Sequence, residues 1–122
     1  MTQYEEKRIE LENRTVKFSV LLIKTLAPLH KDQAMKPIIN QIIRSATSVG
    51  ANYAEANNAS SKRDFANKIY ISKKEIAETR YWLRVIKELS TIQLKELEDE
   101  AKELNLIFQK IISTMKADEN DK

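Results

Sequence analysis

The longest uninterrupted pattern in the chain, residues 62–89, reads KRDFANKIYISKKEIAETRYWLRVIKEL. Apolar and small polar residues recur in it at alternating steps of four and three, and they are Phe65, Ile69, Ser72, Ile76, Thr79, Leu83 and Ile86. This spacing puts one side chain per turn on a single face of an α-helix, the core-facing line that we call the seam. The stretch therefore predicts a long helix that packs against other helices along its whole length.

Three further stretches carry seams of the same kind and predict helices over residues 13–27, 37–56 and 92–115. Their seams are Phe18, Leu22, Leu26 and Leu29, then Ile39, Ile42, Ala46, Val49, Tyr53 and Ala56, then Leu94, Leu97, Ala101, Leu104, Phe108, Ile111 and Met115. Val16, Val20 and Ile23 are expected to widen the first seam.

Short breaks at residues 28–37, 57–61 and 90–91 separate the four predicted helices. Pro28, Pro37 and the pair Ser90 and Thr91 are typical of such helix ends. Short joints make consecutive helices antiparallel neighbours, so we expect an all-α, up-down-up-down four-helix bundle forming one domain over residues 1–122. Residues 1–12 are expected to be an N-terminal arm, and residues 117–122 a frayed, charged tail.

Composition excludes several other classes of protein. The 122 residues include one glycine, two prolines and no cysteine, too few turn formers for a β-sandwich and no thiol for a disulfide, a metal site or a nucleophile. No apolar run is long enough to cross a bilayer, and the start of the chain lacks a secretory signal pattern. We therefore expect a cytoplasmic protein that does not contact membranes.

Charge is distributed unevenly. The formal net charge is +3, with a basic middle, residues 14–90, between acidic ends. Such a distribution attracts polyanions, although an ordinary solubilising surface gives the same total.

The sequence offers little for catalysis. His30 is the only histidine, and neither a phosphate-binding glycine loop nor a nucleophile motif is present. Glu75 and Glu78 are paired at one helical turn, but no histidine joins them as a di-metal site would need, and ion pairing with nearby bases is the better interpretation. We expect no catalytic residues, metal, cofactor or small-molecule substrate, and hence no enzyme.

Polar and small residues in unusual places point to close packing between helices. Beside the seam of residues 37–56 runs a ladder of small residues, Ala46, Gly50 and Ala54. Glycine inside a helix costs about 1 kcal/mol relative to alanine, so a packing reason is expected. We expect another helix, or the ring of a large side chain, to approach closely there. A set of polar residues lies in or beside the seams: Ser45, Ser48, Asn52, Glu55, Ser72 and Thr79. We interpret this set as a structural polar seam that fixes register, and a polar pocket is the alternative.

One flank of the helix at residues 62–89 is a candidate surface for self-association. It carries Ile71, Glu75, Glu78, Trp82, Val85 and Leu89, more apolar area than a solitary bundle needs. We expect Glu75, Glu78, Trp82 and Val85 to form an oligomer interface; the alternative is a broad core contact within one chain.

The other flank is a candidate nucleic-acid surface. Lys73, Arg80, Arg84 and Lys87 follow one another along it, bordered by Tyr70 and Tyr81. Lys62 and Arg63 lie at the N-terminus of the same helix, where backbone N–H groups favour anions. Cations with aromatic rings suit phosphate contact and base stacking, whereas the plain alternative is a solvated charged face.

Three motifs together resemble the small bacterial four-helix bundle proteins known as 23S rRNA intervening-sequence proteins. They are RSATSVGANYAEA at residues 44–56, SKRDF at 61–65 and EIAETRYWLR at 75–84. The family includes the accessory variability determinant proteins of diversity-generating retroelements, which are basic homopentamers that work with a reverse transcriptase and bind nucleic acid. The resemblance implies a four-helix bundle, a ring-shaped homopentamer and RNA or ribonucleoprotein binding. The modest net charge of this chain sets it apart from those strongly basic proteins.

Three functions follow as hypotheses. The first is a non-enzymatic homo-oligomer whose basic surface binds RNA or a ribonucleoprotein such as a reverse transcriptase complex. The second is an assembly scaffold that binds a protein partner without nucleic acid. The third is a small-molecule or metal enzyme that uses Glu75 and Glu78.

Overall fold

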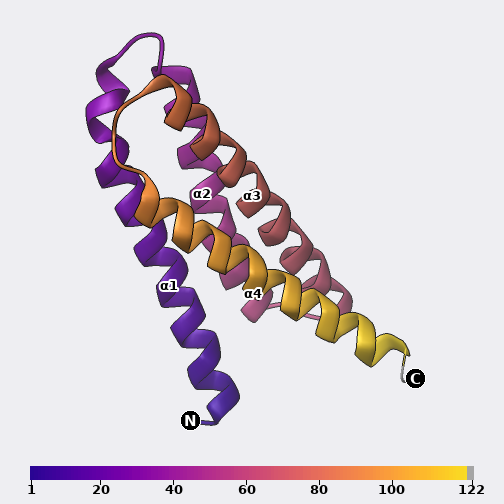
Figure 1. Ribbon diagram of the computed structural model, residues 1–122. Coiled ribbons are helices and arrows are strands. Elements are labelled where there is room, and N and C mark those ends of the chain that lie inside the picture. The colour runs from indigo at the N-terminus through magenta and orange to yellow at the C-terminus, as the bar shows by residue number, and fades with distance from the viewer. Residues whose placement is uncertain (121–122) are drawn as a thin grey trace.

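The computed structural model describes residues 1–120, with side chains through residue 119, and these residues form four α-helices and no strand (Figure 1). The helices are α1 (Gln3–Leu26), α2 (Lys36–Asn57), α3 (Lys62–Leu89) and α4 (Lys95–Asn120), and a 3₁₀-helix, η1 (Ala27–Lys31), follows α1. Successive α-helices run in opposite directions in Figure 1. The predicted all-α, four-helix fold is confirmed.

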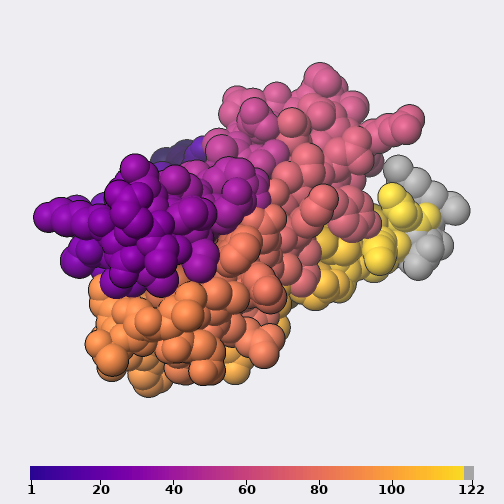
Figure 2. Space-filling view, turned by 90° about the horizontal axis from the view of Figure 1, so that it is seen from above, coloured from indigo at the N-terminus to yellow at the C-terminus, as the bar shows by residue number. Residues whose placement is uncertain are grey.

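The pairing of helices is uneven. The most extensive contact is between α2 and α3, with α1 against α2 and α4 against α3, while α1 and α4 touch least. In Figure 1 the N-terminal end of α1 and the C-terminal end of α4 point apart. Seen from above, η1 and the start of α2 lie beside the segment that leads into α4 (Figure 2).

The first helix is longer than predicted, because residues 3–12 continue α1 instead of forming an arm. The Thr2 side chain accepts a hydrogen bond from the Glu5 backbone N–H at 3.1 Å, which caps the helix ten residues before the expected start. Threonine followed three residues later by glutamate is a capping signal, and it outweighs the absence of a seam there.

The last helix begins later and ends later than predicted. The Ser90 hydroxyl accepts from the Ile92 backbone N–H at 3.1 Å, and this local turn holds residues 90–94 out of the helix. At the other end, residues 117–120 of the expected frayed tail belong to α4, and residues 121–122 lie outside the described part of the chain. The bounds of α3 agree with the sequence interpretation, and its Ser61 N-cap accepts from the Asp64 N–H at 3.0 Å.

Most seam residues form the core. Ile112 is buried in α4 where Ile111 was expected, and Leu29, Phe65 and Met115 are only half-buried. Val16, Val20 and Ile23 do not widen the core-facing side of α1, since all three are exposed. α1 packs mainly against one neighbour, α2, and its buried residues form a single line of Thr15, Phe18, Leu22 and Leu26.

Candidate nucleic-acid interface

Three of the cations predicted for nucleic-acid binding meet on one surface. Arg80, Arg84 and Lys87 are exposed on α3 and line a hollow of about 740 Å³ between α3 and α4. The α4 side of the hollow adds a fourth cation, Lys102. We call Arg80, Arg84, Lys87 and Lys102 the basic groove.

The two arginines of the basic groove are free to bind an anion. Lys87 is paired with Glu98 across the hollow at 3.3 Å, but neither Arg80 nor Arg84 forms a salt bridge within the described residues. Arginine donors in a fixed planar fork suit phosphate oxygens, and these two are spaced by one helical turn.

An aromatic ring lies beside them. Tyr81 is exposed and also lines the hollow, and its ring packs edge-on against Trp82 with the ring centres 5.2 Å apart. A held, exposed ring next to two guanidinium groups is an arrangement that suits a nucleotide base stacked beside its phosphate. The same hollow contains Glu88, Glu98 and Asp99, which limit its positive potential.

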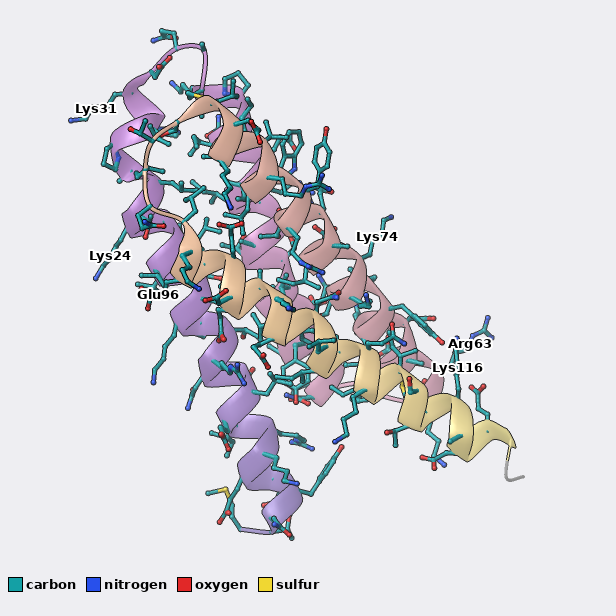
Figure 3. All side chains as sticks on the ribbon, viewed as in Figure 1. Lys24, Lys31, Arg63, Lys74, Glu96 and Lys116 are labelled. Carbon is teal, nitrogen blue, oxygen red and sulfur yellow. The ribbon has the colours of Figure 1, made fainter. Side chains whose placement is uncertain are left out.

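The other predicted cations lie elsewhere. Lys73 is half-buried and donates to Asn105 Oδ1 of α4 at 2.7 Å, so it ties the two helices together. Lys62 and Arg63 are at the N-terminus of α3, and Arg63 is 21 positions before Arg84, about 30 Å along the helix. Figure 3 shows Arg63 at that end of the bundle, near Lys116 in this view. The six predicted residues therefore do not form one site.

The residues predicted for the oligomer interface make contacts inside the chain. Arg44 of α2 reaches both carboxylates, Glu75 at 3.2 Å and Glu78 through its second guanidinium nitrogen. Trp82 donates its indole N–H to Glu78 at 3.1 Å and packs, half-buried, against the core, and Val85 is also half-buried. This placement favours the alternative of a broad contact within one chain, and self-association through these residues stays a prediction.

The Arg44 network shifts the ionisation of its members. Burial alone raises the pKa of Glu78, but the hydrogen bonds from Arg44 and Trp82 more than offset it and hold the pKa below the ordinary value for glutamate. The hydrogen bond to Glu78 in turn raises the pKa of Arg44. Both carboxylates are thus engaged by the same cation.

The predicted polar seam divides into two kinds of contact. Ser45, Ser72 and Thr79 are fully buried and bond between α2 and α3: Ser45 to Thr79 at 2.9 Å, and Ser72 to the Val49 carbonyl at 2.9 Å. The Thr79 hydroxyl also lies 2.8 Å from the Glu75 carbonyl, and the Ser45 hydroxyl lies 3.2 Å from the Ile42 carbonyl, so each hydroxyl contacts both its own helix and the other one.

The remaining members of the set do not cross the core. Ser48 donates to the Arg44 carbonyl at 2.7 Å and Asn52 to the Ser48 carbonyl at 2.8 Å, both within α2. Glu55 is exposed and pairs with Lys68 of α3 at 2.9 Å.

Sequence reasoning missed two residues that matter here. Lys102 belongs to the acidic last helix, so charge counting gave no reason to select it, and only its position across from α3 brings it into the basic groove. Arg44 appeared only within a motif, and its role depends on α3 lying alongside α2. Within residues 1–120, no three metal-ligating side chains of His, Cys, Asp or Glu gather, and no helix is long and apolar enough to span a membrane.

Comparison with known proteins finds a matching family and similar solved structures. The model of a family described as 23S rRNA-intervening sequence protein matches residues 7–113. A crystal structure from Bacteroides thetaiotaomicron, described as a protein with unknown function from the S23 ribosomal protein family, is similar with a TM-score of 0.79 and 32% identity, over 88% of this chain and 98% of that one. No curated protein matches the chain.

Proposed function

The chain belongs to the 23S rRNA-intervening sequence protein family, and from this premise we propose that it is a non-enzymatic, self-associating four-helix bundle that binds RNA through its basic groove. The observation that carries the proposal is the pair Arg80 and Arg84, exposed, without carboxylate partners in the described residues, and next to the exposed ring of Tyr81.

The names of the relatives support RNA as the polyanion that the basic groove binds. The family description names 23S rRNA, and the name of the related structure's family refers to the ribosome. Single-stranded RNA exposes base faces that can stack on Tyr81 while its phosphates meet the arginines. A ribonucleoprotein such as a reverse transcriptase complex presents the same chemistry.

Assembly strengthens such a surface. The basic groove holds four cations beside three acids in one chain, which is a weak field. Several copies in one oligomer repeat that field and raise the local concentration of binding sites. The family resemblance supports a ring-shaped oligomer, and we propose that the ring has five subunits.

The alternative is an assembly scaffold that binds an acidic protein surface through the same groove, because guanidinium groups recognise carboxylates as well as phosphates. The enzymatic hypothesis has less support, since Arg44 occupies both Glu75 and Glu78.

The test measures binding to a structured RNA and to a DNA duplex over a series of salt concentrations. The double variant Arg80→Gln/Arg84→Gln is expected to lower affinity about tenfold or more at low salt and to reduce the salt slope by about one for each lost phosphate contact. The matched control is Lys31→Gln/Lys74→Gln, which removes the same charge from exposed side chains that point away from the bundle elsewhere (Figure 3).

Three results contradict the proposal. They are an equal loss of affinity in the two double variants, a preference for duplex DNA at fixed salt, and an absence of binding at low salt. The last result favours the protein scaffold.

A further inference from the structure

One face of α1 carries a line of exposed apolar side chains. Ile9 is 45% exposed, Val16 57%, Val20 44% and Ile23 40%. Among the described residues, the only other leucine, isoleucine and valine side chains of comparable exposure are Ile71, Leu89 and Leu106, which are scattered over α3 and α4. Single exposed residues are normal on a protein surface, but a line of four along one helix needs a reason.

The four side chains share one side of the helix. They follow steps of seven, four and three, which at 100° per residue keeps them within about a sixth of a turn, on the side away from the buried line of Phe18, Leu22 and Leu26. Ile9, Val16 and Ile23 are separated by one heptad each, the spacing by which two helices pack along a common line. In Figure 1, α1 forms one edge of the molecule.

The charges of α1 indicate what covers this line. Residues 3–13 contain four acids and two bases, whereas residues 14–26 contain three bases and no acid. This distribution suits the dipole of the helix itself, but the dipole gives no reason for an exposed apolar line. A second α1 that runs in the opposite direction brings the acidic half of each helix against the basic half of the other.

We propose that two copies of the chain associate through this face, with their α1 helices antiparallel and Val16 at the two-fold axis. Val16 is the midpoint of the line, so Ile9 of each copy lies opposite Ile23 of the other. Val20 completes the apolar contact on either side of the axis.

Charged residues at the edge of the contact fit the same register. Glu6 and Lys24 are exposed, lie on one flank of the apolar line, and form no salt bridge within the described part of the chain. In the antiparallel pair, the positions of Glu6 in one copy and Lys24 in the other differ by only about 3 Å along the helix axis. Figure 3 shows Lys24 projecting from α1 away from the other helices.

This contact does not depend on RNA binding. It uses neither the basic groove nor the Arg44 network. An isologous contact closes on itself, so it joins two chains, or two rings, and does not close a ring of five.

The absence of cysteine from the chain allows a direct test by disulfide crosslinking. Val16→Cys is expected to give a covalent dimer under mild oxidation, because the two copies of residue 16 meet at the axis. Ile9→Cys and Ile23→Cys alone are expected to form no covalent dimer, since the two copies of each are about 21 Å apart, but an equimolar mixture of the two variants crosslinks. Leu106→Cys, on α4 and 53% exposed, is the matched control.

Two crosslinking outcomes overturn the proposal. In one, Val16→Cys forms dimers no faster than Leu106→Cys. In the other, Ile9→Cys crosslinks with itself, which signals parallel helices.

A charge reversal tests the register without oxidation. Glu6→Lys places like charges opposite Lys24 and is expected to weaken self-association severalfold in sedimentation or native mass measurements, while Glu6→Lys/Lys24→Glu restores it. Val16→Glu, which puts two carboxylates at the axis, is expected to weaken association at least tenfold with unchanged helix content by circular dichroism. A dimer that survives Val16→Glu, or a double variant no better than Glu6→Lys, contradicts the proposed contact.

Discussion

At the scale of single residues, Gly50 determines how closely α1 approaches α2. A Cβ atom at this position would lie 2.6 Å from the Thr15 hydroxyl oxygen and 2.9 Å from the Thr15 Cβ, closer than such atoms come. Thr15 is buried and donates its hydroxyl to the Glu12 carbonyl at 2.6 Å, so it has little freedom to move away. The close approach predicted from the ladder around Gly50 is confirmed, and the partner is α1.

Gly50→Ala is therefore expected to destabilise the protein although alanine is the better helix former. Alanine gains about 1 kcal/mol of helix propensity, and forcing a methyl group into a packed contact costs about 1–3 kcal/mol. Thermal unfolding should show a lower Tm, and Gly50→Ala/Thr15→Ala should recover part of the loss by removing the nearer atom. An increase in Tm for the single variant would contradict the close approach.

At the scale of the helix, α3 has three faces with different roles. Its seam is largely buried and bonds to α2 through the hydroxyls of Ser72 and Thr79, one flank is held to α2 by Arg44, and the other flank opens into the basic groove. Periodicity predicted the three faces because each residue's direction in a helix follows from its number. It did not predict which flank faces a neighbour, since that depends on where α2 and α4 lie.

The tie between α2 and α3 makes stability depend on pH. The pKa of Glu78 is lower in the folded chain than its ordinary value of 4.5, so its carboxylate stabilises the fold above that pH and the contribution is lost as pH falls through the folded pKa. Glu78→Gln is expected to be less stable than the wild type at pH 7, and the difference should shrink below about pH 4.5.

Urea unfolding at pH 7, 5 and 3 measures that difference in the free energy of unfolding. Glu88→Gln is the control, because Glu88 is exposed on the same helix and forms no salt bridge in the described residues. A constant gap between wild type and Glu78→Gln over this range would show that the charge of Glu78 does not stabilise the fold.

At the scale of the whole molecule, one ion pair joins the first and last helices. Arg14 of α1 donates two hydrogen bonds to Glu100 of α4, both at 2.8 Å, and the hydrogen bond raises the pKa of Arg14. Toward the chain ends the two helices separate and leave a largely apolar hollow of about 670 Å³ lined by residues that include Leu11, Ile107 and Ile111. The ion pair is thus the tie at the point where α1 and α4 begin to diverge.

Glu100→Gln is expected to loosen the N-terminal half of α1 with little change elsewhere. It removes the charge from a bidentate pair whose side chains are partly shielded, and α1 has few other contacts with α4. Hydrogen exchange of residues 3–13 should become severalfold faster, while exchange in α3 stays the same. Asp99→Asn, which breaks an exposed pair with Lys95, is the control, and equal effects of the two variants would contradict this role.

Helical periodicity, capping and motif order are local properties of the chain, and they were enough to predict the four helices, the bounds of α3, most of the core and the family. Only the packing of the helices brings Lys102 into the basic groove, ties Lys73 to Asn105, and leaves Val16, Val20 and Ile23 facing outward. A residue's direction around its own helix follows from its number, whereas the neighbour it meets depends on the positions of helices far away in the chain.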